Sequence, residues 1–520
     1  MPSGTGNNKR VLKNTVFLYV RMLITVVVSL YTSRIVLEYL GVVDFGILNV
    51  VGAFVSMFSF ITSSMTNAST RFFSYALGKG DKDDLVATFK ATISIYVLII
   101  VGVLLVAETI GLWFVWNKLN IPPERHASAM IVYQISLLIF CSGIMRIPYN
   151  SSIIAHERMS FYAYTSIIEA VLKLAITFML IVAPFDKLVF YNFMFFIVSF
   201  SVTLWYACFC RKFEECRLGI NRDKKKIKAI FSFVGWNFTS NMGEVAIDQG
   251  INILINFFFG PAINAARGIA FHIKEHVCSF CTNFQLAAAP QITKYYASGD
   301  LFNMNRLVIQ SSKVSFYLMF LVSMPACVGM EMVLEIWLEN VPAYTLIFTR
   351  LILLNRIIDA LAGTIQVAVQ ASGKIKFYVL SLTIVKFLAF ILTFIVFRYF
   401  DVSPEYSIYC TILYAFVSIV IQCFHYQMIS NFPIISYLKE VIGRGLLVVA
   451  FSFVFVYALY EKIYDASNYL TIFVLILYSF FVSLCSCYVF GLNADERLKV
   501  KLFLKSKILI KCSNLKYNVF

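Results

Sequence analysis

Long apolar stretches alternate with short polar ones along the whole chain. Hydropathy predicts helical segments at 14–37, 44–66, 88–115, 127–150, 161–184, 188–210, 229–259, 262–288, 312–336, 345–370, 377–398, 406–430, 441–460 and 468–490. Such segments supply the roughly 20 apolar residues that a helix needs to cross a hydrocarbon core about 30 Å thick. The amphipathic shell of a soluble helical protein is missing. The pattern therefore predicts an all-α polytopic membrane protein with about 14 transmembrane helices.

Composition supports this interpretation. Of 520 residues, 60% are hydrophobic and 14% are charged, whereas a soluble chain is about half apolar and a quarter charged. Residues 1–13 are polar and basic, and the apolar stretch that follows is too long for a cleaved signal, so we expect 14–37 to be a retained helix. Cys278 and Cys281 lie inside a predicted helix, where cysteine commonly serves as a small packing residue. We expect no metal site.

The basic residues are distributed unevenly between the two sides of the predicted membrane. Of 44 Lys and Arg, 31 lie on the side of the two termini, 5 lie on the opposite side, and the remaining 8 lie inside helices. The positive-inside rule then predicts that both termini are cytoplasmic. The net charge of +16 therefore needs no nucleic-acid partner, and we expect the basic run at 222–226 to face anionic lipid.

Two parts of the chain have glycines at matching places. The interval from Gly41 to Gly80 equals the interval from Gly260 to Gly299, and adding 219 to the number of each glycine of the first pair gives the second pair. Six predicted helices separate the copies, and because six is even the copies have the same orientation across the membrane. A parallel repeat of this kind, with its axis along the membrane normal, is typical of two-lobed transporters. The sequence predicts an N-terminal lobe at 1–210, a basic cytoplasmic loop at 211–228 and a C-terminal lobe at 229–430. The last two helices follow at 431–490, and a basic cytoplasmic tail at 491–520.

Polar side chains recur at helical spacing on the first two helices of each predicted lobe. Ionisable groups are costly in lipid, so such stripes should face the protein interior or water. On the second helix, small polar residues could equally mediate tight helix packing. The predicted lining of a polar cavity consists of Asn49, Ser56, Ser63, Asn237, Asn241, Asn252 and Gln285.

Three cations lie at graded depths along these helices. At a rise of 1.5 Å per residue, Arg21 lies about 10 Å from the cytoplasmic end of its helix, Lys274 lies near the middle, and Arg267 lies about 8 Å from the outer end. Phosphate binds Arg and Lys through charge-assisted hydrogen bonds. We therefore expect these three residues to bind an anionic substrate.

Two carboxylates, Glu244 and Asp248, lie one turn apart on the seventh predicted helix. Like charges in a poorly solvated place favour a bound proton or neutralisation by a nearby cation. Coupling to H⁺ or Na⁺ and a resting salt bridge to Lys274 remain equal alternatives; no other cofactor is expected. The pairs Glu169–Lys173 and Arg356–Asp359 have the spacing of local ion pairs.

Four segments carry a family resemblance. Residues 34–46 (RIVLEYLGVVDFG) and 70–81 (TRFFSYALGKGD), with 260–268 (GPAINAARG) and 290–300 (PQITKYYASGD) as second-half counterparts, resemble the polysaccharide flippases of the multidrug/oligosaccharidyl-lipid/polysaccharide exporter superfamily. The resemblance extends over the whole chain and is specific near 34–81 and 229–300.

The resemblance implies a V-shaped, two-lobed protein of the bacterial cytoplasmic membrane that works by alternating access. Its substrate would be an undecaprenyl-diphosphate-linked oligosaccharide, carried from the cytoplasmic to the periplasmic leaflet. Arg21, Arg267 and Lys274 would be the cavity cations, and the last two helices would hold the lipid tail. A monomer is implied, alone or with polysaccharide-assembly proteins. The second helix has no Lys or Arg before Arg71, which favours an O-antigen or capsule unit over a peptidoglycan precursor.

Two other functions are weighed against this one. A multidrug or organic-cation antiporter of the same superfamily would be expected to have twelve helices and an anionic cavity. A membrane enzyme, such as an O-antigen polymerase, would be expected to have a large periplasmic loop, but the longest predicted outer loop has about a dozen residues. The sequence therefore favours a transporter over an enzyme.

Overall fold

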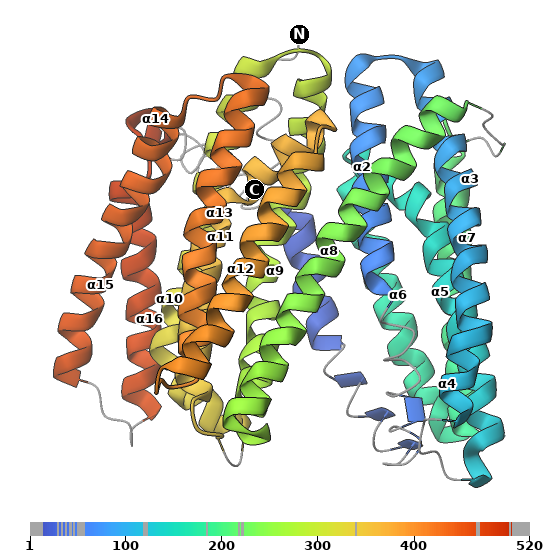
Figure 1. Ribbon diagram of the computed structural model, residues 1–520, viewed down its shortest axis with the longest axis horizontal. Coiled ribbons are helices and arrows are strands. Elements are labelled where there is room, and N and C mark those ends of the chain that lie inside the picture. The colour runs from blue at the N-terminus through green and yellow to red at the C-terminus, as the bar shows by residue number, and fades with distance from the viewer. Residues whose placement is uncertain are drawn as a thin grey trace, which may run out of the picture. The chain divides into compact units, whose positions relative to one another are not determined.

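The computed structural model describes most of the chain. The described residues are 14–28, 31–32, 35–36, 39–40, 44, 47–48, 58–117, 123–183, 186–216, 219, 223–338, 341–463, 469–498 and 501. Within these ranges the regular elements are helices, and no strand is present (Figure 1). The predicted all-α class is confirmed.

The first half of the chain forms helices that overlap the first six predicted segments, but the helix in the second of these ends at Lys79, beyond the end predicted at 66. Their bounds are Asn14–Val28, α2 Ser59–Lys79, α3 Lys82–Val106, a π-helix Ala107–Gly111, α4 Leu112–Asn117, a 3₁₀ turn Pro123–Arg125, α5 His126–Ala155, α6 Met159–Met179, a 3₁₀ turn Leu180–Val182 and α7 Lys187–Cys210.

The second half continues in the same manner. Its helices are α8 Lys224–Phe259, α9 Pro261–Ala297, α10 Leu301–Trp337, α11 Thr345–Ser372, α12 Lys376–Tyr399 and α13 Tyr406–Ser430. The last part contains α14 Ile434–Tyr437, a π-helix Leu438–Gly443, α15 Arg444–Ile463, α16 Tyr469–Ser486 and a π-helix Cys487–Gly491.

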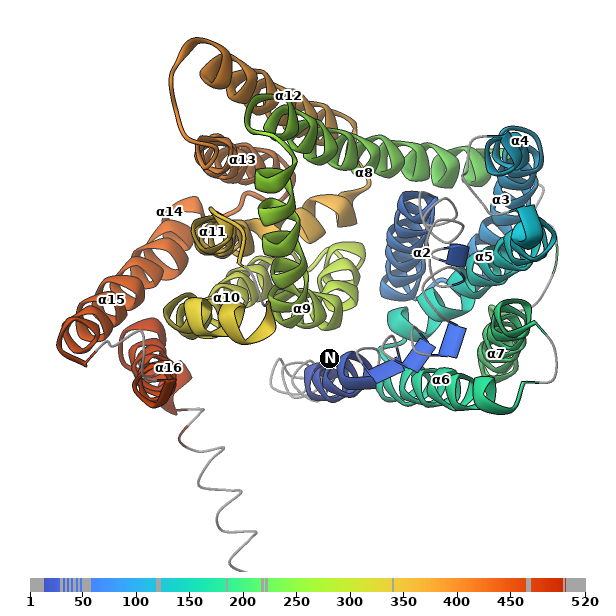
Figure 2. The same ribbon diagram turned by 90° about the horizontal axis from the view of Figure 1, so that it is seen from below.

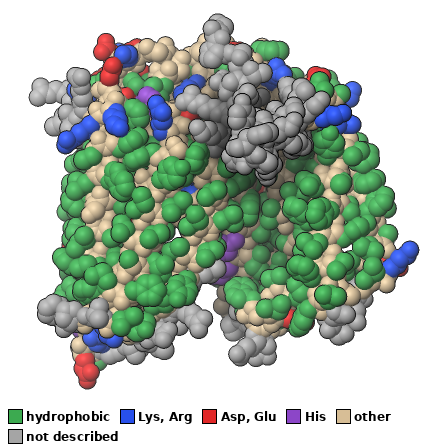
Figure 3. Space-filling view, turned by 180° about the vertical axis from the view of Figure 1, so that it is seen from behind, with side chains coloured by type: hydrophobic (Ala, Val, Ile, Leu, Met, Phe, Trp, Pro, Cys, Tyr) green, Lys and Arg blue, Asp and Glu red, His purple; other side chains and the backbone are tan. Residues whose placement is uncertain are grey.

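Ten of the helices formed by the described residues are long and apolar enough to cross a membrane. The remaining predicted segments fall on Asn14–Val28, α2, α8 and α9, which carry the polar stripes and are therefore less apolar. On the face seen in Figure 3, hydrophobic side chains cover the middle, and most charged side chains lie towards the ends of the helices. The chain is a multi-pass membrane protein.

The offset of 219 between equivalent positions extends through the helices of each half. Adding 219 to the number of the first residue of α3, α5 and α7 gives 301, 345 and 406, the first residues of α10, α11 and α13. The same shift takes α6 to 378–398, close to the observed bounds of α12. The two halves therefore repeat the same helices in the same order.

The glycines of the repeat end equivalent helices. Gly80 and Gly299 have φ angles of 73° and 76°, in the left-handed region that favours glycine. The next residue then begins the following helix: Asp81 accepts a hydrogen bond from the amide of residue 84 (2.9 Å), and Asp300 accepts one from Asn303 (3.1 Å). The Gly-Asp motif is thus a helix stop followed by an N-cap.

The third helix of each half has an irregular feature at nearly the same place, although α10 itself continues as one helix. The π-helix Ala107–Gly111 interrupts the first copy, and Pro325, which cannot donate a backbone hydrogen bond, lies one residue before the equivalent position in α10. The Ala107 carbonyl accepts from the Tyr133 hydroxyl (2.8 Å), and the Cys327 carbonyl accepts from Arg350 Nε (3.0 Å). A neighbouring helix therefore supplies a hydrogen bond that lipid could not.

By its contacts the chain divides into two compact units. Unit 1 consists of residues 1–249, 282–308 and 364–387. In its N-terminal part α5 packs against α2, α3, α6 and α7 (Figure 2). Buried aromatic and aliphatic side chains, among them Phe73, Phe89 and Ile153, fill the space between these helices.

Unit 2 consists of residues 250–281, 309–363 and 388–520. Val277 and Cys281 of α9 lie in an apolar cluster with residues of α10 and α11, and Cys278 packs against it. The packing role predicted for these cysteines is confirmed. A β-carbon on Gly329 of α10 would overlap the Ile476 side chain of α16, so these two helices are in close contact.

Candidate functional site

Arg21 joins the first helix to two others inside unit 1. Its Nη2 donates to Asn283 Oδ1 of α9 at 3.0 Å, and its guanidinium carbon lies 4.7 Å from the centre of the Tyr162 ring of α6. These two partners, an aromatic face and a carboxamide oxygen, are both neutral groups that attract a cation. Such a cation can exchange these neutral partners for an anion.

A second hydrogen bond in unit 1 mirrors the first across the repeat. Asn241 of α8 donates to Ser64 of α2 at 2.9 Å. The numbers of Ser64 and Asn283 differ by 219, the offset of the repeat, and those of Arg21 and Asn241 differ by 220. The first helix of each half therefore bonds to the second helix of the other half at equivalent depth, as in a two-fold-related interface.

Arg267 and Lys274 share one aromatic ring in unit 2. The Arg267 guanidinium carbon lies 4.2 Å from the centre of the Phe271 ring, and Lys274 Nζ lies 3.9 Å from it. Arg267 also donates to the carboxamide oxygen of Asn252 on α8. Positions 267, 271 and 274 follow helical spacing, which brings both predicted cations to one face of α9.

The predicted acidic pair lies on the part of α8 that belongs to unit 1. Glu244 Oε1 lies 3.5 Å from Lys386 Nζ of α12, and the Glu244 side chain is 52% exposed. Asp248, one turn further on, is partly exposed. Sequence reasoning missed Lys386, because no acidic residue stands three or four positions away from it in the sequence of α12.

The other predicted lining residues lie in different environments. Asn237 is buried and donates to the Phe233 carbonyl of its own helix at 2.9 Å. Ser63 is exposed, and Gln285 is half-buried. Asn49 and Ser56 lie outside the described residues.

Two cations that the charge pattern assigns to the basic side take part in contacts between the halves of the repeat. Arg71 of α2 donates through Nε (3.3 Å) and Nη2 (2.9 Å) to the carbonyl of Ala371, at the end of α11. Lys294 of α9 lies 2.7 Å from Glu157, directly after α5. Both cations belong to the segments that carry the resemblance, and this was the signal that could have singled them out.

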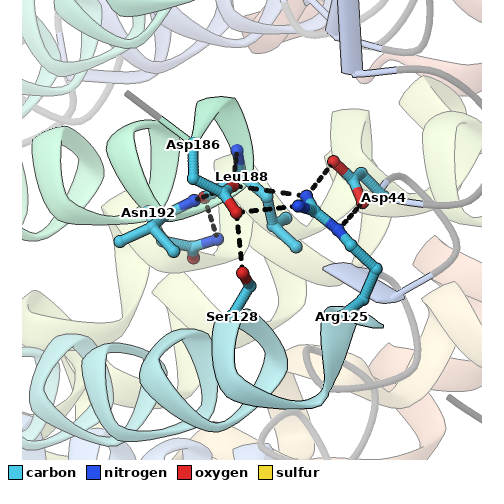
Figure 4. Close-up of polar contacts among 7 residues, drawn as sticks. Asp44, Arg125, Ser128, Asp186, Leu188 and Asn192 are labelled. Carbon is cyan, nitrogen blue, oxygen red and sulfur yellow. Dashed lines mark hydrogen bonds and ion pairs between the residues drawn. The ribbon is translucent and has the colours of Figure 1, made fainter. Parts of the chain in front are cut away.

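Asp44, which lies in the first segment of the resemblance, belongs to a polar network at the N-terminal ends of α5 and α7 (Figure 4). Arg125 bonds to the carboxylates of Asp44 and Asp186, the latter at 2.8 Å, and Ser128 donates to Asp186 at 2.6 Å. Asp186 also accepts from the amide of Leu188 at the start of α7. Burial raises the pKa of Asp186, but these hydrogen bonds and the charge of Arg125 outweigh it, so the pKa lies below its ordinary value.

The two local ion pairs predicted within helices are confirmed. Glu169 lies 2.8 Å from Lys173, and Arg356 lies 3.0 Å from Asp359. Arg146 of α5 also reaches Glu169, at 2.9 Å, so this carboxylate additionally links α5 to α6.

Comparison of the whole fold with solved structures finds transporters. A MATE protein in its straight conformation matches with a TM-score of 0.71 at 11% identity, covering 82% of this chain and 97% of that chain. A multidrug resistance MATE transporter of the MOP superfamily in an outward-facing conformation matches with a TM-score of 0.67 at 12% identity, covering 81% and 96%. A MOP superfamily transporter from Pyrococcus furiosus matches with a TM-score of 0.67 at 11% identity, covering 80% and 96%.

No protein-family model and no curated protein sequence matches the chain. At 11–12% identity the structural similarity concerns the architecture of the helices. Nearly the full length of each solved chain is matched by about four fifths of this one. The protein therefore has the fold of the MATE transporters of the MOP superfamily.

Proposed function

We propose that this protein is a transporter that moves a polyprenyl-diphosphate-linked oligosaccharide from the cytoplasmic to the periplasmic leaflet of a bacterial membrane by alternating access. Its fold supports a transporter, since the similar solved structures are transporters. The lobes at 1–210 and 229–430 would move against each other, and both termini would be cytoplasmic.

The observation that carries the proposal is the pair of cations on one aromatic ring. Arg267 and Lys274 both lie against Phe271. Two cations on one face of a helix repel each other, and a diphosphate would neutralise both through charge-assisted hydrogen bonds. Arg21, held by a carboxamide and a tyrosine ring, offers a third cation of the same kind.

Two contacts between the halves of the repeat bear on where a substrate would enter. Arg71 and Lys294 lie on the side that the positive-inside rule assigns to the cytoplasm, and each bonds to an element of the other half. A substrate entering from the cytoplasmic leaflet would have to separate these contacts.

The acidic residues of α8 are candidates for coupling. Glu244 has Lys386 within 3.5 Å, and Asp248 lies one turn away. We propose that Glu244 and Asp248 bind H⁺ or Na⁺ during the cycle. Transport that is unaffected by the combined changes Glu244→Gln and Asp248→Asn would exclude this coupling.

The multidrug alternative has one specific observation in its favour, because one of the similar structures is a multidrug resistance transporter. The two functions require opposite charges in the substrate-binding site. An organic cation would be repelled by Arg267 and Lys274, whereas the diphosphate is attracted. The helices α15 and α16 are apolar enough to cross a membrane, and they suit a long lipid tail.

Deletion of the gene in its natural host tests the proposal. We expect lipid-linked glycan to accumulate in the cytoplasmic leaflet and sensitivity to cationic drugs to stay unchanged. Raised drug sensitivity without glycan accumulation would instead favour the multidrug function.

A further inference from the structure

The end of α5 has an unusual residue at its capping position. The Arg158 amide donates to the Ile153 carbonyl (2.9 Å) and the Glu157 amide donates to the Ile154 carbonyl (2.8 Å), which together form a Schellman motif. The residue at the left-handed position of this motif is usually glycine. Here it is Glu157, with φ 58°.

The same chain uses glycine at a comparable helix end. Gly299 has φ 76° after α9, with the equivalent hydrogen bonds from Gly299 to Tyr296 (3.1 Å) and from Asp300 to Tyr295 (3.0 Å). The left-handed conformation is unfavourable for a residue that carries a β-carbon. Glycine would therefore be more favourable than glutamate for the backbone at position 157. This indicates that the glutamate side chain is present for a contact that it makes.

That side chain forms an ion pair with the other half of the repeat. The Glu157 carboxylate is 2% exposed and lies 2.7 Å from Lys294 Nζ, which is 21% exposed. A buried carboxylate that loses its cation is strongly destabilised. Separation of Glu157 from Lys294 therefore costs free energy on both sides of the pair, and an anion bound to Lys294 would offset the share that falls on the lysine.

The surroundings of Lys294 suit a phosphorylated sugar. Tyr296 on the same helix lies 6.3 Å from Tyr75 of α2, measured between ring centres. Arg71 and Lys79 lie 4.9 and 5.1 Å from the Tyr75 ring. Cations that bind phosphate and amphipathic rings with an apolar face are thus gathered at the joined ends of α2 and α9.

We propose that Lys294 and Arg71 form a loading site for the diphosphate head group at the cytoplasmic end, and that Glu157 is the internal anion which the head group displaces when this end opens. In the same step the Arg71 guanidinium gives up its hydrogen bonds to the Ala371 carbonyl. The proposal rests on the proposed function and adds a first binding step to it. Glu157 acts here as a positioning residue, because it competes with the substrate for Lys294 and does not touch the substrate itself.

If Glu157 competes with the diphosphate for Lys294, removal of the Glu157 carboxylate should increase the affinity of the protein for a diphosphate. We would measure binding of farnesyl diphosphate to the full-length protein in nanodiscs, with farnesol as the uncharged probe. Glu157→Gln should tighten farnesyl diphosphate binding about tenfold, the effect of one charge-assisted contact, and leave farnesol unchanged. Glu157→Gly keeps the backbone motif and should tighten binding similarly, which separates the effect from misfolding.

Lys294→Gln should weaken binding about tenfold, and Glu157→Gln added to it should give no further gain. The matched control is Glu214→Gln, which removes a carboxylate 2.8 Å from Lys82 on the same side and should leave affinity unchanged. Equal tightening by Glu214→Gln, or tightening by Glu157→Gln that persists without Lys294, would overturn the loading site.

The outcomes also separate the two proposals. Binding that depends on Arg267 and ignores Glu157 and Lys294 would leave the proposed function intact and overturn the loading site alone. Failure of the wild-type protein to bind farnesyl diphosphate would overturn both.

Discussion

Gly78 and Ala297, equivalent residues of the repeat, touch each other. A β-carbon on Gly78 would lie 2.7 Å from Cβ of Ala297 and 2.8 Å from the backbone of Lys294. In a two-fold arrangement, a residue on the axis contacts its own equivalent in the other half. Away from the axis, if the first residue contacts the equivalent of the second, then the second contacts the equivalent of the first. The pairs Arg21–Asn283 and Asn241–Ser64 are the reciprocal contacts. The ends of α2 and α9 therefore meet near the axis of the repeat.

This contact leaves no room for a larger residue. Gly78→Ala should lower the free energy of unfolding by about 1–3 kcal/mol, because backbone atoms of α9 would have to move. Thermal unfolding in detergent measures the effect. Gly102→Ala is the matched control, since nothing lies within 4 Å of a β-carbon there. If both variants lose the same stability, the contact is not tight.

Two glycines have the same φ angle but different surroundings, so substituting each of them distinguishes the cost of backbone strain from the cost of a steric contact. Gly299 and Gly373 both have φ 76°, but a β-carbon on Gly373 would lie 2.6 Å from Arg71 Nη2, whereas the space around Gly299 is open. Gly373→Ala should therefore cost more than Gly299→Ala, by about 1.5–3 kcal/mol, the worth of a hydrogen bond to a charged group. In an Arg71→Ala background the two substitutions should cost the same. A difference that persists there would exclude Arg71 as its cause.

The network around Arg125 should make stability depend on pH in acid. The folded pKa of Asp186 lies below its ordinary value, so its contribution is present above the unfolded pKa of about 3.9 and is lost as the pH falls through the folded value. Unfolding midpoints between neutral pH and acid should fall less steeply for Asp186→Asn than for the wild type. Parallel curves for the two proteins would contradict the assignment.

Asn252 should act through Arg267. Asn252→Ala removes the carboxamide that holds Arg267 and should weaken farnesyl diphosphate binding a few-fold, against about tenfold or more for Arg267→Ala. The double variant should bind like Arg267→Ala. Thr239→Ala on the same helix, whose hydroxyl bonds to its own backbone, is the control. Additive losses for Asn252 and Arg267 would show that they act independently.

Much of the fold could be predicted because a bilayer restricts what a chain can do. Apolar length located the fourteen helical segments, and the Gly-Asp motif located the repeat. The offset from Gly80 to Gly299 also holds for the beginnings of α10, α11 and α13. Local pairs such as Glu169–Lys173 were predictable because helical geometry sets their spacing.

Partners that are distant in sequence could not be predicted. Nothing near Glu157 in the sequence indicates Lys294, which lies 137 positions away, and nothing near Glu244 indicates Lys386. Helical spacing places a side chain on a face but does not say which helix covers that face. The site residues Arg21, Arg267 and Lys274 accordingly remain predictions about substrate, although their neighbours are now known.

Leaflet-to-leaflet movement of the substrate tests the central claim most directly. Purified protein would be reconstituted in liposomes with a fluorescent polyprenyl-diphosphate-linked sugar, and a membrane-impermeant quencher would report the exposed leaflet. We predict that the wild-type protein speeds exchange between leaflets at least tenfold over empty liposomes and that Arg267→Ala with Lys274→Ala abolishes the gain. Exchange no faster than in empty liposomes, or full activity in the double variant, would contradict the account.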